Sequence, residues 1–219
     1  MIRIHIIYDT SYLMGNGSCV YEDFPENSLS YLTISHSIPR EVQLEISRHI
    51  KNPDDAKRNE MARSARALYA RIISLPSYVE VSLENITIPD IHEQILGPDS
   101  DTDKKLLGYA YELLKQNKAD LVFLATRDAG ISAEVVYQAT RSGIHIFCDL
   151  LLDRFKFKVA ELTGTEYTDK NSIIFFCTAC SRMLKFRFYM AGEQSQCPFC
   201  HTALKVPISP YDIPQKLDR

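Results

Sequence analysis

Ile2-Arg3-Ile4-His5-Ile6-Ile7-Tyr8-Asp9 opens the chain, and this stretch decides the fold. Its β-branched and aromatic side chains predict a strand buried inside a sheet. The apolar run stops at Asp9, and in open α/β sheets the chemistry gathers at the carboxyl ends of the strands. Asp9 is therefore the first candidate for a functional residue, although an aspartate here can also simply cap the following turn.

The composition is that of an ordinary soluble globular protein. The 219 residues are 45% apolar and 24% charged, and their number suits one domain with an appendage or two small domains. No stretch is long enough to span a membrane and no secretory signal is visible, so we expect a cytoplasmic protein without a membrane partner. The net charge of −3 divides into −6 over residues 1–150 and +3 over residues 151–219. That asymmetry suits a metal site beside a polyanion-binding surface, although ordinary scatter explains it almost as well.

Strand and helix patterns alternate after the opening strand, which predicts an α/β fold with a mainly parallel sheet. Ser37 is expected to cap a helix that has Pro39 in its first turn. In chain order, the other expected elements are loop and turn over 12–37, a helix over 54–75, a strand over 78–83, a helix opening at 101–103, a strand over 119–126, a helix over 132–141 and a strand over 144–148.

Acidic residues recur where these elements begin or end. Asp128 follows the strand over 119–126, Asp103 opens the helix before that strand, and Glu45 faces inward from the helix after Pro39. In a parallel arrangement these points meet Asp9 at one edge of the sheet. Grouped carboxylates repel one another unless a cation neutralises them, and oxygen-only ligands select Mg²⁺ or Mn²⁺. Simpler roles stay open, since Glu45 can be half exposed and Asp101, Thr102 or Asp103 can be a helix cap.

Four short stretches in residues 1 to about 150 resemble the PIN domain, a metal-dependent nuclease fold. They are Asp9-Thr10-Ser11, Val42-x-x-Glu45-Ile46, Asp103-x-x-Leu106-Leu107-x-x-Ala110 and Leu124-Ala125-Thr126-x-Asp128. The resemblance implies a PIN-like α/β/α sandwich over residues 1–152. It also implies that Asp9, Glu45, Asp103 and Asp128 coordinate one or two Mg²⁺ or Mn²⁺ ions for RNA hydrolysis. Ser11 and Thr126 match positions that support the site by hydrogen bonding, and Asp101 could replace or join Asp103.

Two cysteine pairs predict a separate zinc module. Cys177-Thr178-Ala179-Cys180 and Cys197-Pro198-Phe199-Cys200 have the spacing of a four-thiolate zinc ribbon with one structural Zn²⁺. A module with so few apolar residues needs a bound metal ion to stabilise its fold. Ser181 and His201 stand where ribbon knuckles often carry glycine. We expect a linker over 153–172, the ribbon over 173–206 and a tail over 207–219.

Basic residues in two places predict contact with RNA. Lys185, Arg187 and Tyr189 alternate along a strand between the cysteine pairs, which suits phosphate contact and base stacking by single-stranded nucleic acid. Arg63 and Arg66 belong to the basic helix over 54–75, which also carries Lys57, Arg58 and Arg71. A solvated strand face and a solvated helix face are the simpler explanations. The order of a PIN-like domain followed by a zinc ribbon is similar to that of ribosomal RNA-processing PIN endonucleases.

We therefore expect a divalent-metal-dependent endoribonuclease whose ribbon aids binding of RNA or of a protein partner or inhibitor. The preference for RNA over single-stranded DNA and the oligomeric state are left open. The first alternative is a non-catalytic RNA- or protein-binding module on a PIN scaffold. The second is another Mg²⁺-dependent phosphate enzyme, such as a phosphatase, although Asp9-Thr10-Ser11 lacks the second aspartate that one such superfamily uses as its acid/base.

Overall fold

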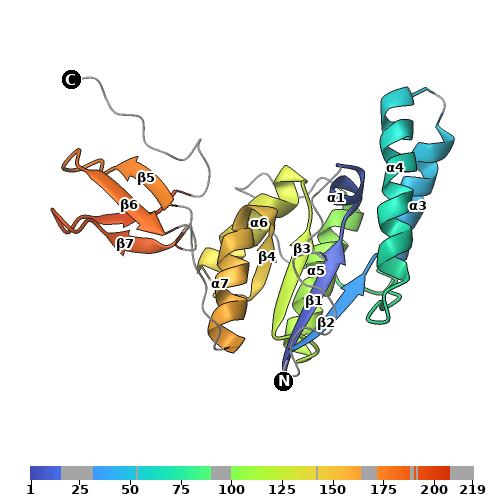
Figure 1. Cartoon of the computed structure of the whole chain (residues 1–219), viewed down its shortest axis with the longest axis horizontal. Coiled ribbons are helices and arrows are strands. Elements are labelled where there is room, and N and C mark those ends of the chain that lie inside the picture. The colour runs from blue at the N-terminus through green and yellow to red at the C-terminus, as the bar shows by residue number, and fades with distance from the viewer. Residues whose placement is uncertain are drawn as a thin grey trace. The chain divides into compact units, whose positions relative to one another are not determined.

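The computed structural model describes residues 1–15, 32–52, 54–89, 100–141, 143–163, 172–187, 190 and 192–207. The chain forms two compact units, residues 1–149 and 150–219, and each is described by itself (Figure 1). This division falls close to the domain boundary expected at residue 152. None of the helices in the described ranges is long and apolar enough to cross a membrane.

The first unit is built on a four-stranded sheet in which every strand is parallel. Its order is β2-β1-β3-β4, so the opening strand β1 lies in the middle. Ile6 of β1 is fully buried and pairs with His36 of β2 and Phe123 of β3. The predicted α/β class with a mainly parallel sheet is confirmed. The strands are β1 (Ile2–Tyr8), β2 (Leu32–Ser37), β3 (Leu121–Ala125) and β4 (Ile146–Cys148).

Two expectations about this sheet were wrong. The loop expected over 12–37 contains the end of a short helix, α1 (Thr10–Met14), and all of β2, while residues 16–31 lie outside the described ranges. The strand expected over 78–83 makes only a single bridge, between Tyr78 and His36.

Buried polar pairs explain why the sequence pattern did not predict β2. Ser37 Oγ lies 2.9 Å from His5 Nε2, and His36 Nδ1 lies 3.0 Å from the Tyr8 hydroxyl. Both Ser37 and His36 are fully buried, because each finds a hydrogen-bond partner on β1. Hydrophobic patterning cannot reveal such a strand. Ser37 is accordingly a strand residue and not the cap of the next helix, whose N-cap position is taken by Pro39.

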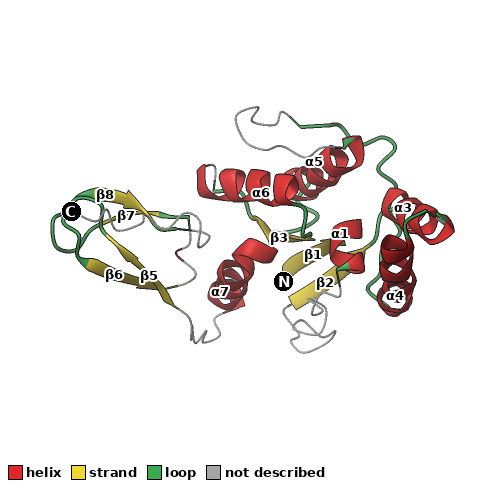
Figure 2. Cartoon of the chain, turned by 90° about the horizontal axis from the view of Figure 1, so that it is seen from above, coloured by secondary structure: helices red, strands yellow, loops and turns green. Residues whose placement is uncertain are grey.

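Helices pack around the sheet of the first unit. After β2 the chain forms α3 (Arg40–Lys51) and α4 (Ala56–Ile73), which lie side by side (Figure 1). Helices α5 (Asp101–Lys115) and α6 (Ala129–Arg141) pack together beside β3 and β4 (Figure 2). Leu106, Leu107 and Ala110 of α5 are buried at helical spacing, as their periodicity predicts.

The second unit contains a helix and two β-hairpins. After the short helical turn η1 (Asp149–Leu151), α7 (Leu152–Thr163) occupies the first part of the linker expected over 153–172. Phe155 and Val159 are buried four residues apart, which is the spacing of one helix face, so this segment is a helix and not a linker. The hairpins are β5 (Ser172–Phe176) with β6 (Met183–Arg187), and β7 (Gln194–Gln196) with β8 (Ala203–Lys205).

Candidate functional site

Asp9 lies at the carboxyl end of β1 and is only 3% exposed. Its side chain caps α1, since Oδ1 accepts a hydrogen bond of 2.6 Å from the Thr10 N–H. Oδ2 accepts hydrogen bonds from the hydroxyls of Thr126, at 2.9 Å, and of Ser11. Asp9 is therefore both a helix cap and a buried carboxylate held by two hydroxyls.

The environment of Asp9 opposes its negative charge. The pKa of Asp9 is raised to about 6, chiefly by burial and to a lesser extent by the nearby charge of Asp103. Hydrogen bonds from Ser11, Thr126 and Thr10 act in the opposite direction and lower the pKa. A bound cation would stabilise the ionised form of such a carboxylate.

The two hydroxyls next to Asp9 join the ends of the two central strands. Thr126 is fully buried, and its Oγ1 accepts a hydrogen bond of 3.0 Å from the Asp128 N–H. Ser11 Oγ accepts one of 2.9 Å from the Arg127 N–H. Each hydroxyl thus binds Asp9 and the backbone after β3 at once. Both residues predicted to support the site are in contact with Asp9.

Glu45 reaches the same place from α3. It lies between Val42 and Ile46, which are both buried, so its helix face is directed at the body of the first unit. Its Oε2 accepts a hydrogen bond of 2.7 Å from Thr10 Oγ1, and its Oε1 lies 3.7 Å from His49 Nε2. Thr10 therefore links Glu45 to Asp9 through its hydroxyl and its N–H.

Asp103 is the third residue of α5, and Ser100 is its N-cap. Ser100 Oγ accepts from the Asp103 N–H at 3.1 Å, and the Asp103 carboxylate accepts from the Ser100 N–H at 3.3 Å. The expectation that Asp101, Thr102 or Asp103 would be the N-cap was therefore wrong. Burial raises the pKa of Asp103, and the charges of Asp128 and Glu45 add to this effect. Asp101 is exposed.

Asp128 holds the start of α6. Its Oδ1 accepts a hydrogen bond of 2.8 Å from the Ile131 N–H, which fixes the side chain just after β3. All four predicted acids, Asp9, Glu45, Asp103 and Asp128, line one cavity of about 620 Å³. The sheet edge, α3 and the start of α5 each supply part of this acidic lining, whereas Asp101 is not part of it.

The acidic lining offers oxygen donors only, which suits a hard divalent cation. Ligand oxygens around one Mg²⁺ lie within about 4.2 Å of one another, twice the metal–oxygen distance. Among the described residues, the only group of three or more metal-ligating side chains whose ligand atoms all lie within 4.8 Å is a group of cysteines. Mg²⁺ often uses one or two carboxylates and keeps several waters, so a wider arrangement of acids still fits such an ion.

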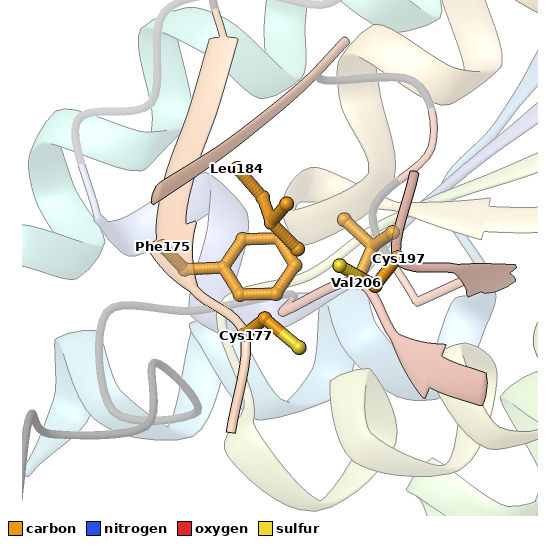
Figure 3. Close-up of a cluster of buried hydrophobic side chains, with 5 residues drawn as sticks. All are labelled: Phe175, Cys177, Leu184, Cys197 and Val206. Carbon is orange, nitrogen blue, oxygen red and sulfur yellow. The ribbon is translucent and has the colours of Figure 1, made fainter. Parts of the chain in front are cut away.

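Cys177, Cys180, Cys197 and Cys200 form that closer group in the second unit. Their sulfurs approach to 3.7 Å in two pairs, and all four are free thiols. Four cysteines at this separation could hold a metal ion such as zinc. The apolar residues Phe175, Leu184 and Val206 surround Cys177 and Cys197 (Figure 3).

The two cysteine loops have the same backbone geometry. Ser181 and His201 adopt positive φ values of 56° and 58°. The Ser181 N–H donates to the Cys177 carbonyl at 2.8 Å, and the His201 N–H donates to the Cys197 carbonyl at 2.9 Å. The backbone angles that usually favour glycine are therefore present at both positions, as their place after the second cysteine predicts.

Arg63 and Arg66, two of the residues predicted to bind RNA, are exposed on α4 but do not line the cavity. Lys185 and Arg187 lie in β6, but their side chains and all of Tyr189 are outside the described residues. The cavity is lined instead by Lys57 and Arg58, from the first turn of α4. The order of charges along a helix does not reveal which turn faces a cavity.

A further strand-end acid was not singled out from the sequence. Asp149 follows β4, and its Oδ1 is buried without a hydrogen-bond partner among the described residues. Burial raises the pKa of Asp149 to about 6, although the charge of Arg127 lowers it. The signal was an acid directly after an apolar strand, the same signal that identified Asp9. Asp149 does not line the cavity.

Comparison with known proteins adds no family to this description. No protein-family model matches the chain, and no curated protein matches its sequence. The acid-lined cavity and the cysteine cluster are therefore the two features from which a function can be inferred.

Proposed function

We propose that this protein is a PIN-type endoribonuclease that hydrolyses RNA phosphodiester bonds with the help of Mg²⁺ or Mn²⁺. The observation that supports the proposal is the convergence of Asp9, Glu45, Asp103 and Asp128 on one cavity at the carboxyl edge of a parallel sheet. These acids come from four separate points of the chain. The pKa values of Asp9 and Asp103 are raised, chiefly by burial and also by the charges of neighbouring acids, and a bound cation would favour the ionised carboxylates.

The four acids would hold one or two such ions. When bound, the ion supplies Lewis-acid stabilisation of the phosphodiester and lowers the pKa of water. The surrounding residues fix the acids: Ser11 and Thr126 orient Asp9, and Thr10 orients Glu45. Side chains fixed by such hydrogen bonds lose less freedom when they bind a ligand.

For the second unit we propose one structural Zn²⁺ on Cys177, Cys180, Cys197 and Cys200, in a zinc-ribbon fold that helps to hold RNA or a protein partner. The close thiols support it. The small apolar core around them also supports it, because so small a module rarely folds without a structural metal ion or disulfides.

Cleavage of single-stranded RNA in the presence of Mn²⁺ tests the proposed activity. The wild-type protein should cleave and the Asp9→Asn, Asp128→Asn double variant should not. An Asp101→Asn variant is the matched control, because Asp101 is an exposed acid outside the cavity. Cleavage by the double variant at the wild-type rate would exclude this site as the centre of the activity.

One observation favours a second candidate function, a non-catalytic RNA- or protein-binding module on the same scaffold. Asp9 is already satisfied by several hydrogen bonds, so its position is also explained by a structural role. A scaffold of this kind would not be stabilised by Mn²⁺. The effect of Mn²⁺ on the melting temperature therefore separates the two functions.

A further inference from the structure

The acid-lined cavity has a second, basic part. Lys57 and Arg58, called the basic pair below, line it from the first turn of α4 together with Asp55. Helix α4 packs against α1, which begins directly after Asp9, and against α3, which carries Glu45. The basic pair therefore belongs to the same cavity as the four acids of the proposed metal site.

The basic pair does not neutralise those acids. The charged partner of Arg58 is Asp55, with Nε 3.5 Å from Oδ2, and the Arg58 side chain is 64% exposed. Within the described ranges, the Lys57 side chain forms no ion pair or hydrogen bond, and neither cation pairs with Asp9, Glu45, Asp103 or Asp128. Lys57 is therefore free to bind an anionic ligand, and Arg58 can do so by giving up its exposed pair with Asp55.

We propose that the basic pair binds phosphate groups of the RNA strand on either side of the bond that is cut. This inference rests on the proposed function and deepens it by naming the residues that hold the substrate strand beside the metal site. Each nucleotide of a strand brings one negative charge. A bound cation neutralises the carboxylates only where it binds. The phosphates on either side of the bond to be cleaved are therefore still repelled by the four carboxylates. Lys57 and Arg58 offset this repulsion from the part of the cavity that α4 lines.

Asp55 prepares Arg58 for this contact. Its Oδ1 accepts a hydrogen bond of 2.9 Å from the Arg58 N–H, which caps α4, and its Oδ2 faces the guanidinium. Because the Arg58 side chain is exposed, the ion pair is weak and a phosphate can replace the carboxylate. A guanidinium can then bind the phosphate through two N–H groups.

Helix α5 supplies a matched control. Lys115, its last residue, and Lys118 just after it are also exposed and cationic, but they do not line the cavity. Lys115 lies twelve residues after Asp103, or about 18 Å along the helix axis. Removal of either pair lowers the protein charge equally, so a difference between the variants reports position and not net charge.

The experiment compares Lys57→Ala, Arg58→Ala with Lys115→Ala, Lys118→Ala in the full chain. A fluorescent single-stranded RNA serves as the probe for both binding and Mn²⁺-dependent cleavage, measured over a range of salt concentrations. Thermal unfolding, with and without Mn²⁺, verifies the fold and the metal response of each variant. Alanine favours helix, so neither variant should unfold its helix.

We expect the Lys57→Ala, Arg58→Ala variant to bind RNA about tenfold or more weakly, with a corresponding loss in kcat/KM. The slope of log affinity against log salt should become shallower by about 1.4, as two lost phosphate contacts require. The Lys115→Ala, Lys118→Ala variant should stay within about twofold of wild type, and both should keep the response to Mn²⁺.

Equal effects of the two double variants, or no effect of either, would overturn the role of the basic pair. Failure of the wild-type protein to bind RNA would overturn it too. Wild-type protein that binds RNA but does not cleave it would refute the proposed function instead. In that case, a loss of RNA binding confined to Lys57→Ala, Arg58→Ala still supports the phosphate contact.

Discussion

The Thr126 hydroxyl donates a hydrogen bond of 2.9 Å to the Asp9 carboxylate, and both residues are buried. This bond joins the ends of β1 and β3, and Thr126 also accepts from the Asp128 N–H. One hydroxyl thus positions two of the four acids in the cavity. Asp9 and Asp128 therefore belong to one hydrogen-bonded edge of the sheet and are not independent surface charges.

Replacement of Thr126 by valine should destabilise the protein. Valine has nearly the same shape but leaves the Asp9 carboxylate and the Asp128 N–H each without one partner, which costs about 1–3 kcal/mol. Urea denaturation measures the change, with Thr33→Val as the matched control. Thr33 lies at an exposed position of β2, so its replacement should change the free energy of unfolding by less than about 0.5 kcal/mol. Equal effects of the two substitutions would show that the Thr126 hydroxyl has no special role.

The raised pKa of Asp9 predicts a pH dependence of stability in the absence of Mg²⁺ and Mn²⁺. Below its ordinary value of 3.8 the carboxyl is protonated in both the folded and unfolded states, and it carries no penalty. As the pH rises through about 6, the folded state must hold a buried charge. Its stability should fall by on the order of 3 kcal/mol relative to an Asp9→Asn variant, which does not titrate there.

Urea denaturation of both proteins between pH 4 and pH 7.5, with zinc retained, measures this difference. Mn²⁺ should reduce the loss in the wild-type protein, because it stabilises the ionised carboxylate. A stability difference that does not change across this pH range would contradict the assigned environment of Asp9.

Zinc should be required by the second unit and not by the first. A Cys180→Ser variant is expected to lose the metal and the ordered structure of the hairpins, because the small core around the thiols is too small to fold alone. Cys148→Ala is the control, since Cys148 is buried in β4 and lies outside the cysteine cluster. Metal analysis and limited proteolysis provide the readouts. A Cys180→Ser protein that keeps one zinc per chain and resists proteolysis would show that this thiol is not a ligand.

The residues after each cysteine pair should tolerate glycine well. Ser181 and His201 adopt positive φ values of 56° and 58°, which cost a non-glycine residue about 1 kcal/mol. Ser181→Gly and His201→Gly should therefore slow zinc loss to a chelator or leave it unchanged, despite the greater freedom of glycine in the unfolded chain. Faster zinc loss in both variants would mean that the two side chains have a stabilising role of their own.

Part of this structure could be predicted from the sequence because its signals are local. The opening strand is a continuous apolar run, and Asp9 and Asp128 stand directly after strands, where parallel topology brings them together. Cys177 and Cys197 likewise carry their partners three residues away, so the cluster follows from spacing alone.

The rest depends on contacts that no local pattern contains. Strand β2 is buried because His36 finds Tyr8, a partner 28 residues earlier in the chain. The choice of Lys57 over Arg63 depends on how α4 packs, since both are cations on one helix and only Lys57 lines the cavity. Such relationships arise only when the elements are packed together.

The central claim is that the acids in the cavity bind a divalent metal ion and use it to cleave RNA. The most direct test is the single-turnover rate of RNA cleavage as a function of Mn²⁺ concentration for wild type, Asp103→Asn and Asp101→Asn. Both acids lie in the first turn of α5, but only Asp103 lines the cavity. We predict that Asp103→Asn needs far more Mn²⁺ and loses at least about a hundredfold in rate, the scale of a single catalytic group, while Asp101→Asn matches the wild type. Equal rates and equal Mn²⁺ requirements in all three proteins would contradict the claim.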